Sequence, residues 1–240
     1  MNTAILNAER AEENRIVLRN SHIAAVSLVG PVGCGKTTLI GQTLCRLARS
    51  LRVAVTIEGP LTQSGAAGSE HPGARFLSAQ AESINASWFG RLLGSGQLAD
   101  RDLVLIEQTA AASRGCIELG QSGCVAVFSV AAGVQAVARC PALIECARLI
   151  LVTKTDLLPA VRFDRQAFED QVRALNPSVE VLEVSSSTGA GLDRWIRWLG
   201  GEVEKARRSP SLDELTASPD PAAQMLPPGF VTFDRPRSSL

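Results

Sequence analysis

The chain has 240 residues, 45% of them hydrophobic, which is enough for a folded core in one large domain or in a domain with a tail. Lys and Arg together count 24, as do Asp and Glu, and only 4% of the residues are aromatic. Without a basic field or stacking platforms, neither nucleic acid nor an anionic membrane is expected as a partner.

The N-terminal residues place Glu12, Glu13 and Asn14 in a helical pattern, which is not the composition of a secretory signal. Residues 119–138 carry no charge over a length that could span a bilayer, but polar residues and glycines interrupt them. Their most apolar part, Cys124–Val130, has the length of a buried strand. The six cysteines form no C-x-x-C pair. These features predict reduced thiols and a cytoplasmic protein without a membrane span.

A strand, a glycine-rich loop and a helix are predicted in succession near the N-terminus. Residues 23–29 form a short apolar run, and residues 39–49 carry apolar side chains at helical spacing. The segment between them matches the phosphate-binding pattern G-x-x-x-x-G-K-S/T, with Gly30, Pro31, Val32, Gly33, Cys34, Gly35, Lys36, Thr37 and Thr38. Glycines let backbone N–H groups surround phosphate oxygens, and the helix N-terminus adds its positive dipole end. Lys36 is expected to reach the terminal phosphates, and the Thr37 hydroxyl to bind Mg²⁺.

Short apolar runs recur along the chain, with helical stretches between several of them. They are Ala24–Val29, Val53–Ile57, Leu103–Ile106, Val125–Val130, Leu149–Val152 and Val179–Val184. Near-continuous apolar strands alternating with helices predict an α/β P-loop NTPase, with a mostly parallel sheet covered by helices on both faces. Residues 1–200 are expected to form this domain. Residues 201–240 lack periodicity and are rich in Pro and Ser, which predicts a flexible or loosely docked tail.

A second motif, Thr153-Lys154-Thr155-Asp156, directly follows a predicted strand. Guanine presents two adjacent N–H donors that the Asp156 carboxylate can accept, whereas adenine has no matching pair. Lys154 would lay its alkyl stem along the base. Thr153 stands where guanine-binding loops usually carry Asn, and its shorter side chain predicts a weaker base contact. Ser185 and Ser186, in the polar loop before the next helix, are expected to contact the base from the other side.

Together these segments resemble the nickel-incorporation GTPases of hydrogenase and urease maturation, and the hydrogenase branch (HypB type) fits best. The resemblance covers about residues 14–199. The matching segments are GPVGCGKTTL, TIEG (Thr56–Gly59), LVLIEQ (Leu103–Gln108), IELG (Ile117–Gly120), LVTKTDLLPAVRFD (Leu151–Asp164), LNP (Leu175–Pro177) and VSSSTGAGLDRWIRWL (Val184–Leu199). The resemblance implies a GTP- and Mg²⁺-dependent hydrolase that forms a homodimer with nucleotide. It also implies partners in metalloenzyme maturation, such as a hydrogenase precursor or a nickel chaperone.

The chain departs from the family pattern where the metal would bind. The family's Cys-His pair falls in the segment Glu82–Ala86, and its later cysteine falls near Ser113 or Arg114. Cys116 is the nearest thiol and the candidate nickel or zinc ligand, but one displaced thiolate does not replace a thiolate and an imidazole. His71 is expected to be a surface residue.

A second set of departures concerns GTP hydrolysis. The family's Glu-Gly-Asp appears as Glu58-Gly59-Pro60, and two later family aspartates appear as Ser64 and Ala66. The family's Glu-Asn-Val-Gly appears as residues 107–110, which end in Ala110, whose Cβ could obstruct a close N–H contact with phosphate. Glu107 and Glu58 are expected to line the hydrolytic side with Lys36 and Thr37. These changes predict GTP binding near the family level with slow hydrolysis.

Two functions of different classes follow from this comparison. The first is a GTP-binding accessory protein for nickel insertion in nickel–iron hydrogenase maturation. The second is a nucleotide-dependent binding or scaffold protein that has lost metal transfer, with or without loss of hydrolysis. A small-molecule kinase on the same phosphate loop would leave the Thr-Lys-x-Asp motif without a role.

Overall fold

The computed structural model describes residues 3–47, 50–59, 74–79, 83–110 and 115–210. The strands are β1 (Ala24–Gly30), β2 (Val53–Glu58), β3 (Ala74–Ala79), β4 (Leu103–Thr109), β5 (Gly123–Ser129), β6 (Leu149–Thr153) and β7 (Glu180–Glu183). The helices are α1 (Thr3–Asn20), α2 (Lys36–Leu47), α3 (Ala86–Gly94), α4 (Gln135–Arg139), α5 (Pro141–Cys146), α6 (Arg165–Leu175) and α7 (Leu192–Arg208). Short 3₁₀ turns, η2 (Val130–Ala132) and η3 (Thr155–Leu157), follow β5 and β6.

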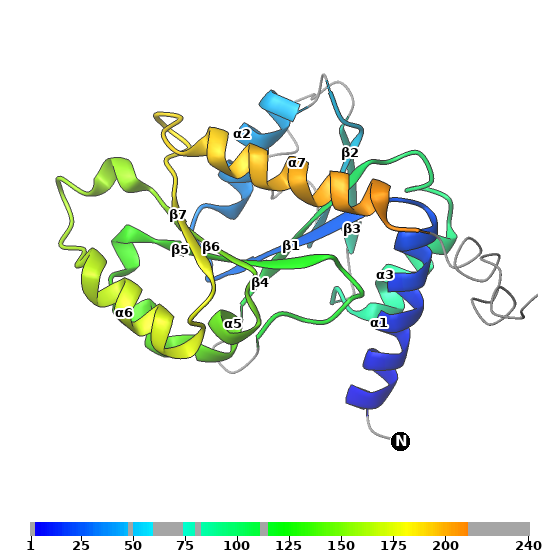
Figure 1. Ribbon diagram of the computed structural model, residues 1–240, viewed down its shortest axis with the longest axis horizontal. Coiled ribbons are helices and arrows are strands. Elements are labelled where there is room, and N and C mark those ends of the chain that lie inside the picture. The colour runs from blue at the N-terminus through cyan, green and yellow to red at the C-terminus, as the bar shows by residue number, and fades with distance from the viewer. Residues whose placement is uncertain (1–2, 48–49, 60–73, 80–82, 111–114, 211–240) are drawn as a thin grey trace, which may run out of the picture.

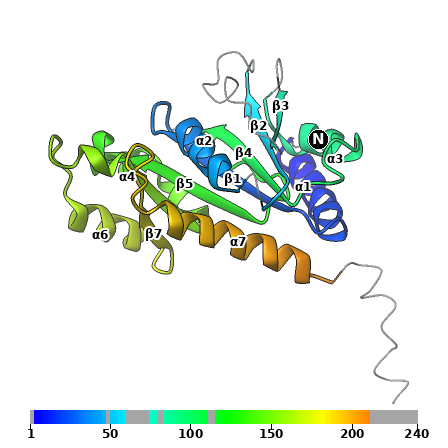
Figure 2. The same ribbon diagram turned by 90° about the horizontal axis from the view of Figure 1, so that it is seen from above.

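The strands described form one sheet in the order β3-β2-β4-β1-β5-β6-β7, and every pair in it is parallel. Helices α2 and α7 cover one face of the sheet, while α1, α3, α5 and α6 lie on the other (Figures 1 and 2). The predicted α/β P-loop fold with helices on both faces is therefore confirmed. Strand β1 is central, with β4 and β5 on its two sides, so its carboxyl end lies at the switch point where such sheets bind ligands.

The core divides between the two faces of the sheet. Under α2 and α7 it includes Leu28, Leu39 and Trp195, all fully buried. The Trp195 indole Nε1 donates a hydrogen bond of 2.9 Å to Thr43 Oγ1, and its ring stacks on Trp198 with centroids 5.6 Å apart. The central strands β1 and β5 are buried along their whole length, which explains their continuous apolar sequence.

All six predicted strands exist, with ends that differ by at most three residues. Strand β3 was missed because Arg75 and Ser78 interrupt its apolar residues, and most of this edge strand is only half-buried. Helix α7 continues to Arg208, eight residues past the predicted domain boundary at residue 200, and the division into domain and tail stays a prediction. Buried Val203 and ion pairs one turn apart, such as Arg208 Nη2 with Glu204 Oε2 at 3.3 Å, hold this extension. Residues 211–240 lie outside the described part, so the tail remains a prediction.

The uncharged stretch 119–138 contains β5 and the start of α4. None of the helices in the described ranges is both long and apolar enough to cross a membrane.

Candidate nucleotide-binding site

The phosphate loop connects the end of β1 to the start of α2, as its sequence predicts. At Gly30 a Cβ would lie 2.3 Å from the Val127 carbonyl oxygen, so only glycine lets the loop leave β1 this close to β5. Gly35 has a φ of 94°, which other residues rarely adopt, and it turns the chain directly into α2. The loop N–H groups thus lead into a helix N-terminus, an arrangement suited to phosphate.

Lys36 is buried at the base of this loop. Its Nζ donates to the carbonyl oxygens of Gly30 at 2.8 Å and Pro31 at 3.0 Å. The Cys34 Sγ lies 3.8 Å from the same ammonium, yet burial raises the pKa of the Cys34 thiol. The positive charge of Lys36 is thus held inside the loop, next to a neutral thiol.

Thr37 and Glu107 meet across the loop and the neighbouring strand. The Thr37 Oγ1 donates a hydrogen bond of 2.6 Å to Glu107 Oε1, and both side chains are half-buried. The register between β1 and β4, which pairs Leu28 with Glu107, places this carboxylate beside the phosphate loop. A hydroxyl and a carboxylate are oxygen ligands of the kind Mg²⁺ prefers, so this pair fits the predicted Mg²⁺ site directly or through a bound water.

The other residues predicted to take part in hydrolysis make fewer contacts with the phosphate loop. Glu58 ends β2 with an exposed side chain and forms no hydrogen bond or ion pair with another described residue. The backbone N–H of Ala110 donates to the Gly30 carbonyl oxygen at 3.0 Å, which ties the end of β4 to the phosphate loop. Pro60, Ser64, Ala66 and His71 lie outside the described residues, so the predictions made for them stand untested.

The predicted base contact of Thr153 stays a prediction, but its side chain is turned toward the phosphate loop. Its side chain is buried, with 2% of its surface exposed. The Oγ1 lies 2.5 Å from the Cys34 carbonyl oxygen and 3.0 Å from that of Phe128. One hydroxyl proton shared between two backbone acceptors leaves nothing to donate to a ligand. Thr153 ties the start of the loop that carries Asp156 to the phosphate loop.

Asp156 lies exposed at the carboxyl edge of the sheet, where a base could reach it. Its Oδ1 accepts a hydrogen bond of 2.6 Å from the buried Ser185 hydroxyl, and Ser187 Oγ lies 3.0 Å from Ser185 Oγ. These hydroxyls, Ser185 foremost, hold the pKa of Asp156 below its usual range. Because the Ser185 side chain is engaged with Asp156, Ser185 orients that carboxylate and would meet a base only through its backbone. Ser186 is half-buried in the same loop.

Lys154 adopts a left-handed backbone conformation with a φ of 59°. A Cβ on Gly35 would lie 3.8 Å from Lys154 Cε, so the lysine stem extends alongside the phosphate loop. The two loops predicted from separate motifs are therefore adjacent. Phosphate donors, an oxygen pair for Mg²⁺ and an ionised carboxylate share one edge of the sheet, and this set of groups fits a guanine nucleotide with Mg²⁺.

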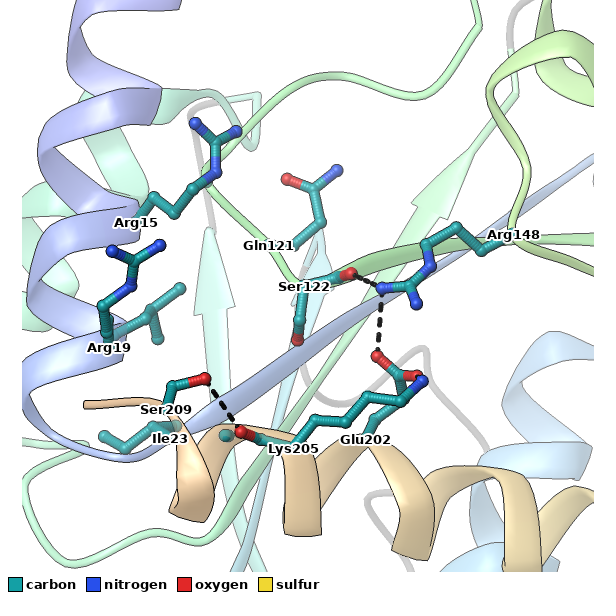
Figure 3. A pocket seen from close by; sticks show the side chains of 12 residues that line it. Arg15, Arg19, Ile23, Gln121, Ser122, Arg148, Glu202, Lys205 and Ser209 are labelled. Carbon is teal, nitrogen blue, oxygen red and sulfur yellow. Dashed lines mark hydrogen bonds and ion pairs between the residues drawn. The ribbon is translucent and has the colours of Figure 1, made fainter. Parts of the chain in front are cut away.

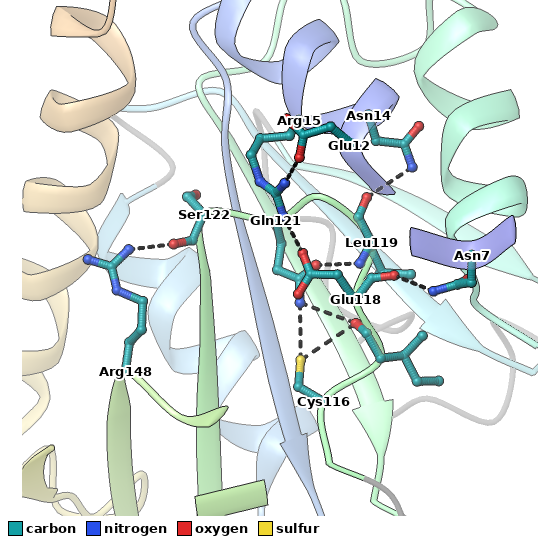
Figure 4. A network of polar contacts seen from close by, with 11 residues as sticks. Asn7, Glu12, Asn14, Arg15, Cys116, Glu118, Leu119, Gln121, Ser122 and Arg148 are labelled. Carbon is teal, nitrogen blue, oxygen red and sulfur yellow. Dashed lines mark hydrogen bonds and ion pairs between the residues drawn. The ribbon is translucent and has the colours of Figure 1, made fainter. Parts of the chain in front are cut away.

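Cys116 lies at the opposite edge, next to Cys124 and Cys146. Its backbone N–H donates to Cys146 Sγ at 3.2 Å, and Gln121 Nε2 donates to Cys116 Sγ at 3.1 Å (Figure 4). A hydrogen bond from the Cys124 thiol lowers the pKa of Cys146 to about 6. Sequence reasoning missed this grouping. The signal was that Cys124 lies at the start of β5 and Cys146 shortly before β6, because the amino ends of neighbouring parallel strands lie side by side.

These thiols do not make a metal centre. Within the described residues, no group of three or more His, Cys, Asp or Glu side chains is placed to hold a metal ion. Ser83, which follows Glu82 in the segment aligned with the family's Cys-His pair, is exposed, and residues 80–82 and 111–114 are not described. The described residues alone thus present no nickel or zinc site, and Cys116 as a ligand remains a prediction.

No protein-family profile matches the chain. The hydrogenase maturation factor HypB of Azotobacter chroococcum mcd 1 is 30% identical over 215 residues, which are 88% of this chain and 70% of that relative. The crystal structure of HypB from Archaeoglobus fulgidus matches with a TM-score of 0.75 at 28% identity, covering 83% of this chain and 99% of that one. HypB from Helicobacter pylori, solved in complex with nickel, matches with a TM-score of 0.72 at 20% identity, covering 83% of this chain and 96% of that one. At this identity the match shows that the two chains share a fold.

Proposed function

The chain belongs to the HypB family of hydrogenase maturation factors, and we propose that it binds GTP with Mg²⁺ and hydrolyses the nucleotide slowly while assisting nickel insertion. The observation that carries this proposal is the meeting of two motifs at one edge of the sheet. Thr153 Oγ1 joins the Cys34 carbonyl at 2.5 Å, so the loop with Asp156 is fixed against the loop with Lys36. A nucleotide held by both loops would be read at its phosphates and at its base.

In this proposal each residue has a defined task. Lys36 and the loop N–H groups would bind the phosphates, and Thr37 and Glu107 would hold Mg²⁺, which would supply positive charge to stabilise the transferring phosphoryl group. Asp156 accepts the two guanine donors, with Ser185 holding it in place. Glu58, at the end of β2, is the further candidate for positioning water.

Guanine selection is tested by changing the base and the carboxylate together. Xanthine carries a carbonyl where guanine carries the exocyclic amino group, so Asp156→Asn presents an amide donor that matches xanthine and opposes guanine. Calorimetry should find that the parent prefers GTP to ATP and to xanthosine triphosphate, and that Asp156→Asn reverses the second preference. Thr155→Ser, in the same loop, serves as the matched control. Equal affinity of the parent for GTP and ATP would refute guanine selection.

Slow hydrolysis is tested by single-turnover kinetics at saturating GTP. Ala110→Gly removes the Cβ and restores the glycine of the family pattern, so we expect it to raise the hydrolysis rate and leave GTP affinity within a few fold. A parent rate equal to that of HypB proteins with the glycine would contradict the proposal. Loss of turnover in Glu107→Gln and Thr37→Ala would support the assigned Mg²⁺ site.

A second function, a nucleotide-dependent scaffold without metal transfer, is favoured by the lack of a metal-binding group among the described residues. Stoichiometric binding of Ni²⁺ or Zn²⁺, measured by equilibrium dialysis, separates the two functions. Tight binding that Cys116→Ala abolishes would support metal delivery. Absence of binding in the presence of GTP would support the scaffold, and in either case hydrogenase precursors and nickel chaperones are the partners to test.

A further inference from the structure

A polar pocket lies at the amino edge of the sheet, opposite the nucleotide site. Its volume is about 260 Å³, and it is enclosed by four segments of the chain: α1, the loop before β5, the residue before β6, and the end of α7. In Figure 3 Arg15 and Arg19 lie on one side of the pocket, and Arg148 and Glu202 on the other, with Gln121 and Ser122 between them. Buried Leu18 and Ile23 contribute an apolar wall.

Positive charge dominates the lining of this pocket. Its cations are Arg15, Arg19, Arg148 and Lys205, and its one carboxylate is Glu202, of which 2% is exposed. Glu202 Oε2 lies 3.2 Å from Arg148 Nη1, and Oε1 lies 2.6 Å from Lys205 Nζ. Two cations share one carboxylate, so a positive charge is left over on this side.

The α1 side of the pocket adds a second positive charge. Arg15 pairs with Glu12 and, at 2.6 Å, with Glu118, and is therefore compensated. The Arg19 guanidinium forms no hydrogen bond or ion pair with another residue in the part of the chain described. Arg15 with Glu12 and Glu118 leaves one negative charge, and the C-termini of α1 and α7, which also end here, add partial charges of about −0.5 each. The attraction for an anion therefore comes from the unpaired Arg19 guanidinium and the facing Arg148 and Lys205, not from a large net positive charge.

A guanidinium without a partner recognises carboxylates and phosphates through two parallel hydrogen bonds. Lys205 and Arg148, across the pocket, would contact the far side of such a ligand. The volume lies below the range of about 300–1,000 Å³ typical of sites for drug-sized molecules, which favours a small ligand. The volume and the lining of the pocket thus suit a small anion, and Leu18 and Ile23 could contact a short apolar part of it.

We propose that this pocket binds a small organic or inorganic oxyanion, carrying carboxylate or phosphate, between Arg19 and the Arg148–Lys205 side. The site is separate from the nucleotide site and does not depend on the proposed GTP chemistry. Carboxylate and phosphate share the same recognition chemistry, and the experiment below distinguishes them.

The test is a titration of the full-length protein with succinate and, separately, with inorganic phosphate, followed in ¹H–¹⁵N correlation spectra. We expect saturable shifts of the amides of residues 119–122 and 205–209 with at least one probe, with dissociation constants of roughly millimolar order. Phosphate shifts at residues 30–38 report the phosphate loop and are counted apart. Shifts at the pocket with succinate alone identify a carboxylate site, and with phosphate alone a phosphate site.

Two variants test the assigned contacts. Arg19→Gln keeps the polar stem and breaks no contact seen in the described residues, so the fold should persist, and the dissociation constant should rise roughly tenfold or more. Arg173→Gln, on α6 and with a similarly exposed charge, should leave it unchanged. If neither probe shifts the pocket amides saturably, or if Arg19→Gln binds as tightly as the parent, the proposal is overturned.

Discussion

Replacing Thr153 by valine tests whether this residue ties the two nucleotide loops together. Valine keeps the shape and the buried methyl group but removes the hydroxyl that lies 2.5 Å from the Cys34 carbonyl oxygen. Since Thr153 is 2% exposed, water has little access to the carbonyl left behind. An unsatisfied buried acceptor costs about 1–3 kcal/mol, so the free energy of unfolding should fall by that amount.

Differential scanning calorimetry measures this effect directly. For a chain of this size each kcal/mol lowers the melting temperature by roughly 2–4 °C, so Thr153→Val should melt several degrees below the parent. Thr153→Ser, which keeps the hydroxyl and loses the methyl group, serves as the control for the hydrogen bond. GDP affinity should also fall in Thr153→Val because the phosphate loop loses a fixed point. An unchanged melting temperature and GDP affinity in Thr153→Val would refute the tether.

Three further outcomes follow from the contacts described. Ser185→Ala removes the main cause of the low pKa of Asp156. Because the pKa of Asp156 is lowered in the parent, its carboxylate remains ionised at a lower pH than in Ser185→Ala. GDP affinity should therefore persist to lower pH in the parent, and identical pH profiles of the two proteins would contradict this. Trp195→Phe removes the 2.9 Å hydrogen bond to Thr43 and leaves a small cavity, which should cost about 1–4 kcal/mol in urea unfolding. Arg148→Met and Lys205→Met should each cost about 0–1 kcal/mol, because each cation is about half exposed or more. The double variant should cost about 3 kcal/mol or more, since it leaves Glu202 buried without a partner, and simple additivity would contradict this.

The parts of the fold that the sequence predicted are those set by local patterns. Short continuous apolar runs such as Leu149–Val152, which alternate with helical stretches, indicate buried parallel strands. The spacing of the phosphate-loop motif likewise predicts a strand before the loop and a helix after it. Strand β3 escaped because its polar residues hide the pattern of a half-buried edge strand. The end of α7 escaped because Lys205–Arg208 reads as a charged tail. Ion pairs one turn apart and the negative end of the helix dipole stabilise those charges within a helix.

The candidate site shows a different limit of sequence reasoning. Motif spacing placed Lys36, Thr37 and Asp156 at one edge of the sheet, because they follow the carboxyl ends of parallel strands. It did not reveal which way a side chain points. Thr153 was expected at the base, yet its hydroxyl turns inward to the phosphate loop. Cys146 is 30 residues from Cys116 in the sequence and meets it only through the tertiary fold.

Helix α7 runs from one site to the other. It begins at Leu192 after the loop that orients Asp156, its Trp195 bonds to α2, and its last turns supply Glu202 and Lys205 to the pocket. A continuous path is not coupling, because coupling needs an element with two arrangements that each ligand stabilises differently. Trp195, Leu199 and Val203 pack α7 into the core at every turn, so moving the helix would disturb the burial of all three side chains. We therefore expect GDP affinity to stay within about twofold when succinate saturates the pocket, equivalent to a coupling free energy below about 0.4 kcal/mol. A change of tenfold in calorimetry would mean that α7 moves as a body between two packed states.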